Sequence, residues 1–403
     1  MSTFSQDLSF RSFNTTPIIL QVIPTLGNGG VEIETLEIAH AIVHAGGKAL
    51  IAANIGKAKE KRLNEEINFK NLPLDTKNPL KISKNVKLLK ELILKEKVDI
   101  VHVRSRAPAW SAYKATRALG VPLVTTYHAA YSSRTVFKTF YNSIMAKGDR
   151  VIAISQFILD HLLERYGEGS WFDPSKLRLI QRGIDPEVFN PDTLSDEHLK
   201  QLRKSWGISP EMRLILLPGR ISRSKGQDLL IEALSRMRHA EVTAVLLGSA
   251  QGHETYRDNL LQLASSLDLE GRVKWIPPFL DMPLAYQLAD IVVCPSFVPE
   301  GFGRVLAEAQ AMRKPIVSSN HGAAREVIKD GVTGWLTPPG EPNALAQALD
   351  DLLDLPPDTR DEMGKKGRMR VKSYFSKDAM ISKTLAVYDE LLRERNHPCF
   401  THG

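Results

Sequence analysis

The chain has 403 residues, of which 43% are hydrophobic and 25% charged. This composition is typical of soluble globular proteins, so it excludes a disordered, collagen-like or fibrous chain, and the length predicts two or three domains. No apolar run reaches the ~20 residues that span a bilayer. The polar start predicts no secretion signal, and Cys294 and Cys399 are too few for a disulfide framework or a zinc site. We therefore expect a cytoplasmic protein.

The net charge of +7 resides in the first half of the chain. Residues 1–190 contain 26 Lys and Arg against 18 Asp and Glu, whereas residues 191–403 contain 27 against 28. A local surplus of positive charge attracts anionic partners. The first half is therefore the part that we expect to meet an acidic or membrane-held molecule.

Short β-type stretches alternate with amphipathic helical stretches along almost the whole chain. In the first half the predicted strands are 18–23, 48–53, 98–103, 122–127, 150–154 and 177–181. In the second half they are 213–218, 242–247, 273–276, 290–295, 315–318 and 334–336. Several are continuous apolar runs, as strands covered by helices on both faces require. The alternation predicts an α/β fold with doubly wound parallel sheets.

A stretch rich in proline and charge, 183–208, separates two halves of similar size. It predicts a first domain over residues 17–190 and a second over residues 191–375. A last amphipathic stretch, 376–395, follows after the second half has completed its strands.

A glycine-rich turn joins the first strand to the helical stretch that follows it. The turn contains Gly29 and Gly30, and Glu32 comes directly after them. Such a turn lets backbone N–H groups approach a phosphate at the positive end of a helix. The spacing matches neither the dinucleotide fingerprint nor a Walker loop. An ordinary tight turn remains an equal alternative.

Two cations follow the strand 213–218. Arg220 and Lys225 lie on the loop that leaves its carboxyl end, where α/β sheets bind ligands. An arginine fork beside a lysine point charge suits a diphosphate. The alternative is a solvated basic loop.

A third motif follows the apolar strand 290–295. Glu300 comes first, then Gly301, Phe302 and Gly303, and Glu308 comes eight residues after Glu300. Carboxylates accept paired hydrogen bonds from vicinal hydroxyls, and a loop of free N–H groups beside them suits a phosphate. This pattern predicts a site for a sugar phosphate. The alternative is a turn residue and a charge on a helix face.

His128 and a lysine-rich helix complete the candidate residues. His128 ends the strand 122–127 and is expected at the carboxyl edge of a sheet. In the helical stretch after Pro79, Lys84, Lys87 and Lys90 recur at a spacing of three and predict one cationic face. Such a face suits an anionic membrane surface, although an ordinary helix with a solvated lysine side is equally compatible.

Together these motifs resemble the retaining glycosyltransferases of family 4, which have the two-domain GT-B fold. The resemblance covers the chain from about Pro17 to Arg395 and implies two Rossmann-like domains facing each other across a cleft. The first, acceptor-binding domain would regain the final helix, and the second would bind the nucleotide-sugar donor. One departure is Arg182, where the family commonly has Asn.

The resemblance also implies roles for the residues at the donor diphosphate and the sugar. Arg220 and Lys225 would neutralise the diphosphate, and Gly29 and Gly30 would offer backbone N–H groups to it. Glu300 would hold hydroxyls of the transferred sugar.

The remaining motif residues would surround the same donor. The segment Gly301–Gly303, with Phe302 and Gly303 in particular, would present backbone amides. Glu308 would hold the ribose hydroxyls. His128 would contact the region of the sugar's 6-hydroxyl and support the developing positive charge.

No Asp-x-Asp pair occurs in the sequence, so we expect catalysis without a metal or other cofactor, with Arg220 and Lys225 neutralising the diphosphate. The expected reaction moves a hexose, mannose from GDP-mannose, onto an envelope glycolipid such as a lipopolysaccharide core. Donors carrying UDP with glucose, galactose or N-acetylglucosamine are the alternatives. Glu32, Lys84, Lys87 and Lys90 are expected on the acceptor side.

Three other expectations follow from the resemblance and the charge. The enzyme would contact the anionic cytoplasmic face of the inner membrane. A sugar phosphorylase or a nucleotide-sugar epimerase, both GT-B enzymes, is the first alternative function. A nucleic-acid binder is a weaker alternative, because the basic helix lacks the interleaved aromatics that stack on bases.

Overall fold

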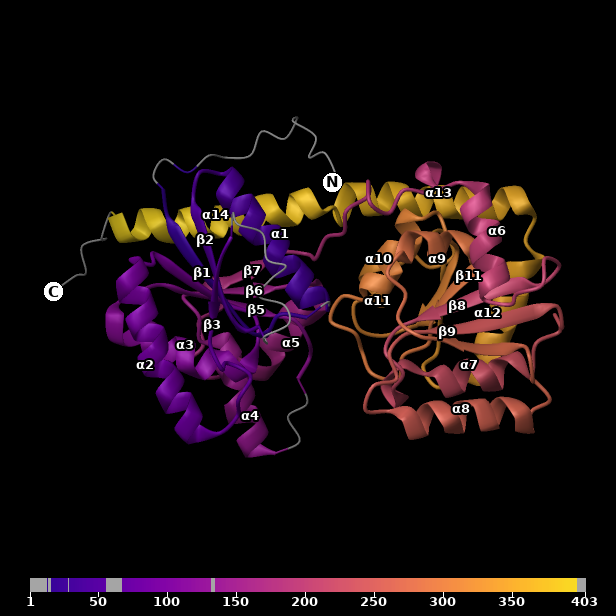
Figure 1. Ribbon diagram of the computed structural model, residues 1–403, viewed down its shortest axis with the longest axis horizontal. Helices are drawn as coiled ribbons and strands as arrows, with labels where there is room; N and C mark the ends of the chain where they lie inside the picture. The colour runs from indigo at the N-terminus through magenta and orange to yellow at the C-terminus, as the bar shows by residue number, and fades with distance from the viewer. Residues whose placement is uncertain (1–12, 14–15, 28, 56–66, 132–134, 397–403) are drawn as a thin grey trace. The chain divides into compact units, whose positions relative to one another are not determined.

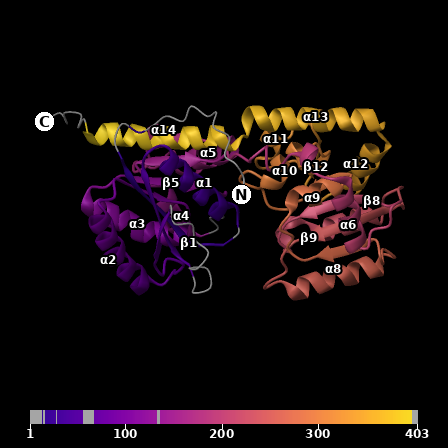
Figure 2. The same cartoon turned by 45° about the horizontal axis from the view of Figure 1, so that its top comes forward.

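The structure is a computed structural model that describes residue 13 and residues 16–27, 29–55, 67–131 and 135–396. It divides into two compact units. Unit 1 joins the residues before Arg182 to those after Lys377, and unit 2 comprises Arg182–Lys377. Figures 1 and 2 show that each unit is a sheet with helices packed against it.

Unit 1 contains a seven-stranded parallel sheet in the order β3-β2-β1-β4-β5-β6-β7. Its strands are β1 Ile18–Thr25, β2 Lys48–Asn54, β3 Asn68–Asn71, β4 Ile100–Val103, β5 Leu123–Tyr127, β6 Arg150–Ala153 and β7 Leu177–Leu179. Its helices are α1 Gly30–His44, α2 Pro79–Glu96, α3 Arg106–Leu119, α4 Val136–Ser143, α5 Gln156–Tyr166 and α14 Lys377–Asn396. Figure 1 shows α14 on one side of this sheet and α2, α3 and α4 on the other.

Unit 2 contains a six-stranded parallel sheet in the order β10-β9-β8-β11-β12-β13. Its strands are β8 Arg213–Pro218, β9 Val242–Leu247, β10 Val273–Ile276, β11 Ile291–Cys294, β12 Ile316–Ser319 and β13 Trp335–Thr337. Its helices are α6 Asp196–Ser205, α7 Gln227–Leu234, α8 Glu254–Ser266, α9 Met282–Leu288, α10 Arg304–Ala311, α11 Ala324–Val327, α12 Pro342–Asp354 and α13 Pro357–Tyr374.

The predicted fold class is confirmed, since both sheets are parallel and doubly wound. Each of the twelve predicted strands corresponds to a strand of the structure. The missed strand is β3, whose sequence Asn-Phe-Lys-Asn has a single apolar residue. It pairs only with β2 at the edge of the sheet, so it needs no apolar run to be stable there.

Each sheet has a point where the strand order reverses. In unit 1 this switch point lies between β1 and β4, and in unit 2 it lies between β8 and β11. Open α/β sheets bind ligands beyond the carboxyl ends of the strands at such points. The loops after β1, β4, β8 and β11 are therefore the places where a site is expected.

The chain passes from unit 1 to unit 2 between Gln181 and Arg182, earlier than the expected boundary at residue 190. The stretch after Arg182 belongs to unit 2 because Ile184 donates its N–H to the carbonyl of Phe375 and Arg368 donates to the carbonyl of Phe189. Proline and charge made this stretch look like a linker in the sequence.

The final helix, α14, packs on unit 1. Its residues Ile381, Leu385, Tyr388 and Leu391 are buried in the same apolar cluster as Ile19 and other side chains of the first sheet. None of the helices in the described part of the chain has the length and apolarity to cross a membrane.

Candidate active site

The loops after β8 and β11 bring a lysine and a glutamate together at the switch point of unit 2. The Nζ of Lys225 donates to Oε1 of Glu300 over 2.7 Å. The hydroxyl of Ser296 donates to the same oxygen over 2.8 Å, and the thiol of Cys294 lies 3.7 Å from it. Both members of the ion pair keep about a quarter of the side chain exposed, 26% for Lys225 and 25% for Glu300. The pair is thus formed within the protein but reachable from outside.

A glycine makes the approach of these two loops feasible. Gly226, directly after Lys225, has a φ of +70°, and a Cβ built on it would lie 2.1 Å from the carbonyl oxygen of Pro295. Any other residue would push the β8 loop away from the loop that follows β11. Phe297 then donates its N–H to the carbonyl of Ser224 over 3.0 Å, which ties the loops together.

The pair holds both of its members in the charged form. Burial raises the pKa of Glu300, but the charge of Lys225 and the hydrogen bonds from Lys225 and Ser296 outweigh burial and bring this pKa below its ordinary value. Burial lowers the pKa of Lys225, and the charge of Glu300 outweighs it in the opposite direction. At neutral pH the site therefore offers an ionised carboxylate that accepts hydrogen bonds and an ammonium group that donates them.

The second glutamate of the motif is fixed by two side chains. Glu308 lies on α10 and is buried, with 8% of the residue exposed. Its Oε2 accepts from the hydroxyl of Tyr286 over 2.8 Å, and its Oε1 accepts from Nε of Arg304 over 3.0 Å. Tyr286 is fully buried on α9, so the carboxylate has little freedom to turn. The sequence analysis did not identify Tyr286, because it lies on a different helix from the motif.

Between the two glutamates, Phe302 and Gly303 mainly stabilise the fold. Phe302 is 3% exposed and packs edge-on against Phe375, with ring centroids 5.6 Å apart. Gly303 caps α10 with a φ of +77°. Since the first N–H groups of a helix lack partners within it, the loop before α10 can present amides to an anion. Arg220 is exposed on the β8 loop, and its carbonyl accepts from Nε2 of Gln227.

In unit 1 the glycine-rich turn carries a carboxylate. Gly29 is the N-cap of α1, and a Cβ built on it would lie 2.5 Å from Oε2 of Glu32. The side chain of Glu32 thus folds back onto the turn, where the positive end of α1 stabilises a negative charge. Gly30 is the first residue of the helix. The predicted approach of a phosphate to Gly29 and Gly30 would require Glu32 to move.

His128 follows directly after β5, at the carboxyl edge of the first sheet, and is partly exposed. The loop that carries it is held by aromatic contacts. The ring of Tyr127 lies 4.7 Å from that of Tyr131, and the guanidinium of Arg106 lies 3.9 Å above the ring of Tyr131.

A buried polar network that the sequence analysis did not identify lies beneath this edge. Nη1 of Arg104, directly after β4, donates to Oε1 of Glu34 on α1 over 2.6 Å, and its Nη2 donates to the side chain of Gln21 over 2.9 Å. The exposed fractions of the Arg104 and Glu34 side chains are only 1% and 6%.

His102 connects this network to the C-terminal helix. Its Nδ1 lies 2.6 Å from the hydroxyl of Tyr388, and its Nε2 lies 2.7 Å from Oγ1 of Thr126. Burial and the nearby charge of Arg104 lower the pKa of His102, so the ring stays neutral. The network therefore ties β4, β5 and α14 to one another.

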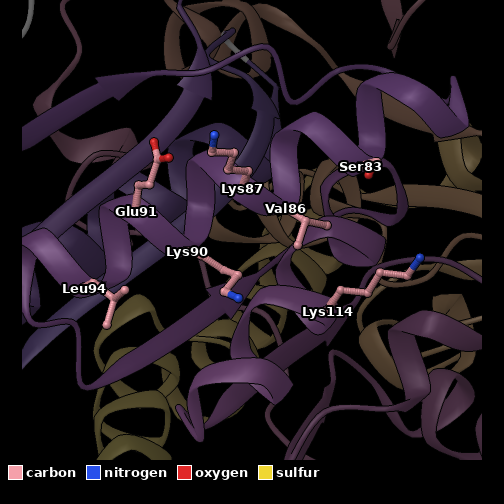
Figure 3. Close-up of a pocket in the computed structure, with 7 residues that line it drawn as sticks. All are labelled: Ser83, Val86, Lys87, Lys90, Glu91, Leu94 and Lys114. Carbon is pink, nitrogen blue, oxygen red and sulfur yellow. The ribbon is translucent and has the colours of Figure 1, made fainter.

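The predicted lysine helix, α2, begins where the sequence indicates. Pro79 is its first residue, and the side chain of Asn78 accepts from the N–H of Leu80 over 2.9 Å. Lys84 and Lys87 are exposed and Lys90 is partly buried. An open hollow of about 440 Å³ lies against this helix and α3 (Figure 3). It is lined by Ser83, Val86, Lys87, Lys90, Glu91, Leu94 and Lys114.

The structure thus places the predicted residues in separate groups. Lys225 and Glu300 meet directly, and Arg220, Gly301, Phe302, Gly303 and Glu308 lie on the same loops or on α10 of unit 2. In unit 1, Gly29 and His128 lie on loops and Gly30 and Glu32 lie in the first turn of α1, apart from Lys84, Lys87 and Lys90 on α2. Among the described residues no cluster of three or more His, Cys, Asp or Glu side chains could hold a metal ion. The roles of all these residues, and catalysis without a metal, stay predictions.

Two protein families match the chain, one in each half. The family described as "Glycosyltransferase Family 4" matches residues 28–188, and the family described as "Glycosyl transferases group 1" matches residues 199–370.

Individual proteins agree with these matches. A D-inositol 3-phosphate glycosyltransferase of Xylanimonas cellulosilytica is 31% identical over 312 residues, which cover 74% of this chain and 73% of the relative. One of the same description from Salinispora tropica is 29% identical over 318 residues, which span 73% of this chain but only 64% of the relative.

Solved structures give the same picture. The structure of a glycosyltransferase from Rickettsia africae is 35% identical, covers 94% of this chain and all of the other, and superposes with a TM-score of 0.86. The Anabaena protein HepE, solved with UDP-glucose, is 24% identical, covers 92% of this chain and 99% of its own, and has a TM-score of 0.78. At that identity HepE supports the fold.

Proposed function

The chain belongs to the group 1 glycosyltransferases of the GT-B fold, and from this premise we propose that it is a retaining enzyme that moves a hexose from a nucleoside diphosphate sugar to a phosphate-bearing acceptor. The ion pair of Lys225 and Glu300 at the switch point of unit 2 is the observation that carries the proposal. A cation and an ionised carboxylate, both reachable, are what a diphosphate joined to a sugar requires.

Lys225 and Arg220 act on the leaving group. Departure of a nucleoside diphosphate builds negative charge on the bridging phosphate, and cations already in place stabilise that charge without reorganising. The amides before α10 add dipoles of the same sign. When the donor binds, its diphosphate replaces Glu300 as the partner of Lys225, and the carboxylate accepts hydroxyls of the hexose instead.

Glu308 holds the ribose of the donor. Its carboxylate is already oriented by Tyr286 and Arg304, and each oxygen has a lone pair left for a hydroxyl. Glu308 comes eight residues after Glu300 in the motif. In this proposal the first carboxylate binds the hexose and the second binds the ribose of the same donor. His128 and the turn at Gly29 belong to unit 1, and their expected roles, His128 at the donor sugar and Gly29 and Gly30 at its diphosphate, stay predictions.

In this proposal the configuration at C1 of the hexose is retained without a covalent intermediate. The acceptor hydroxyl attacks from the face that the diphosphate leaves, and the leaving phosphate takes its proton. The C1–O bond to the diphosphate breaks as the bond to the acceptor oxygen forms, so atoms and charges balance. Since Glu300 is occupied by hydroxyls, it is not the nucleophile of a double displacement.

The acceptor carries phosphate, because the surplus of basic residues lies in the first half of the chain. An envelope glycolipid of the lipopolysaccharide-core type fits this description. D-inositol 3-phosphate, which the names of the curated relatives specify for those proteins, is the second candidate. For the donor, GDP-mannose is the first candidate, and UDP-glucose, with which HepE was solved, is the second.

A thermal-shift panel of UDP-, GDP- and ADP-sugars tests the proposal. A donor that binds only the folded protein raises the melting temperature, and the base that does so identifies the donor class. Release of nucleoside diphosphate is then measured with and without each acceptor. Release that requires an acceptor supports a transferase. Turnover of the nucleotide sugar without an acceptor would instead identify an epimerase, and no response to any of the donors would contradict the proposal.

A further inference from the structure

The short helix α4 of unit 1 exposes three large apolar side chains. Val136 is 84% exposed, Phe137 is 87% exposed and Phe140 is 60% exposed. At one residue per 100°, the three lie on adjoining positions of one helix side. Single exposed apolar residues are common on soluble proteins, but a cluster of this kind marks a surface that meets a partner.

A groove of about 650 Å³ lies beside these side chains, between α4 and the end of α5. It is lined by Thr135, Val136, Thr139, Phe140, Ser143, Lys147, Arg165, Tyr166, Gly169 and Trp171. Two of these residues are cations and none carries a carboxylate. Nη2 of Arg165 donates to Oγ1 of Thr139 over 2.7 Å, and Nζ of Lys147 lies 5.0 Å above the ring of Trp171.

We propose that this face of unit 1, which we call the α4 surface (Val136, Phe137, Phe140, Lys147, Arg165 and Trp171), docks on a bilayer that contains anionic phospholipids. Val136 and Phe137 would enter the boundary between head groups and acyl chains. The two cations would lie at the level of the lipid phosphates, and Trp171, which is 45% exposed, suits the interface between them.

The charges distinguish this occupant from a second copy of the chain. A symmetric pair of copies would bring the cations of two grooves against each other without a carboxylate in the lining to neutralise them. Three apolar side chains on an eight-residue helix also give far less than the roughly 800 Å² per partner of a stable protein interface. An anionic bilayer supplies the missing negative charge.

The hollow beside α2, which contains Lys87, Lys90 and Lys114, extends the basic part of the α4 surface. α2 packs against α3, and on α3 the ring of Trp110 lies 5.1 Å from that of Phe140 on α4. Figure 1 shows the three helices on one side of the unit, and Figure 3 shows Lys87, Lys90 and Lys114 around the hollow. Leu94, 62% exposed, is the more exposed of the two apolar side chains that line the hollow, the other being Val86. With Glu91 its lining has the same net charge, +2, as the groove beside α4, but it exposes fewer large apolar side chains, so we expect α2 to contribute less than α4.

The α4 surface also predicts where the acceptor is held. α4 follows β5 along the chain, with His128 at the start of the connecting segment. Arg106 links the two, because its guanidinium lies 3.9 Å from the centroid of the Tyr131 ring in that segment and its Nη1 donates to Oδ1 of Asn142 on α4 over 2.7 Å. A lipid held at the α4 surface is therefore held on a helix that is connected by these contacts to the loop carrying His128. The inference that the acceptor is held in the membrane deepens the proposed function and rests on it. The docking of the α4 surface on a bilayer does not rest on it.

Vesicle flotation of the full-length protein tests the docking. We expect binding to vesicles of phosphatidylcholine mixed with phosphatidylglycerol, little binding to phosphatidylcholine alone, and release by high salt. Replacing both Lys147 and Arg165 by Gln should weaken binding by about fivefold per cation. V136S/F137S should weaken it at least as much. L280S is the matched control, because Leu280 of unit 2 is a single apolar side chain that is 90% exposed.

The outcomes separate the alternatives. Equal binding to neutral and anionic vesicles, or variants that float like the unchanged protein, would overturn the proposal. A concentration-dependent dimer that V136S/F137S abolishes would identify a second copy as the occupant and would overturn it as well. Donor-induced thermal shifts are measured on the unchanged protein and on the same variants, which should keep them. If the unchanged protein shows these shifts but does not bind anionic vesicles, only the docking proposal fails, and if it binds the vesicles without showing the shifts, only the proposed function fails.

Discussion

Both units place an arginine or lysine beside a glutamate at the switch point of a parallel sheet, yet the two ion pairs differ in exposure. In unit 1 the side chains of Arg104 and Glu34 are 1% and 6% exposed, whereas those of Lys225 and Glu300 in unit 2 are 26% and 25% exposed. The buried pair cannot exchange its partner for a ligand without unfolding its surroundings. The accessible pair can.

The neighbours of the two pairs reinforce this difference. Arg104 is surrounded by the protein groups of Gln21 and His102, all of them buried. Lys225 and Glu300 lie on loops shaped by glycine, one of which leads to the start of α10. The same pair of charges thus stabilises the fold in one unit and forms a binding site in the other, and exposure is what decides between the two roles.

The largest effect should come from breaking the buried pair. R104M leaves the carboxylate of Glu34 buried without its guanidinium, which costs about 3–5 kcal/mol of folding free energy. The measurement is the urea midpoint of unfolding. R213M is the control, because the exposed pair of Arg213 and Asp290 should contribute less than about 1 kcal/mol. R104M/E34M should recover much of the loss. Equal stability of R104M and R213M would contradict the assignment of a structural role.

The second effect is on catalysis. K225A should lower kcat/KM at least about a hundredfold, since removing one contact to a developing charge costs roughly 3 kcal/mol. Its melting temperature should change little, because the pair is partly exposed. R223A is the matched control, two residues away in the same turn and exposed. If R223A lost as much activity as K225A, general electrostatic attraction by the loop would replace the specific role of Lys225.

The third effect concerns the orientation of Glu308. Y286F removes a hydrogen bond to a carboxylate, and we expect the donor KM to rise with little change in kcat, by about five- to thirty-fold for a loss of about 1–2 kcal/mol. With a donor that lacks the ribose hydroxyls this penalty should vanish, which a general loss of stability would not produce. Y388F, which loses a buried hydroxyl in unit 1, should leave the donor KM unchanged. A rise in KM that is independent of the ribose would argue against this role.

These predictions also show what the sequence could and could not indicate. The strands were predictable because buried parallel strands require apolar runs. The residues Lys225 and Glu300 were identifiable because each follows such a strand, and the carboxyl ends of neighbouring parallel strands meet. Their direct contact depends on the pairing of β8 with β11. Gly226 indicated a tight turn in the sequence, but it did not indicate that this turn packs against the carbonyl of Pro295.

The residues that the sequence analysis missed act across long distances in the chain. Tyr286 reaches Glu308 from another helix, and Tyr388 reaches His102 across 286 positions. No spacing rule links such residues, because their contact depends on how whole helices pack. A histidine within an apolar strand, as His102 is, could have indicated a buried polar partner but not which one. The position of the Glu32 side chain, which folds back onto the glycine-rich turn, likewise could not be predicted from sequence spacing.

The smallest effect is a shift in pH dependence, and its direction follows from the ion pair. The pKa of Glu300 lies below its ordinary value because the charge and hydrogen bonds of Lys225 and Ser296 outweigh burial. The charged carboxylate therefore persists as pH falls, and the contribution of this group to folding stability is lost only as pH falls through the lowered pKa. In K225M burial is no longer opposed by that charge, so the pKa rises. The acidic limb of the residual kcat/KM should move to higher pH, whereas in S296A, which loses one hydrogen bond, it should move in the same direction by less. An acidic limb that stays in place in K225M would mean that a group other than Glu300 titrates there, and the accessible pair would then lose its part in substrate binding.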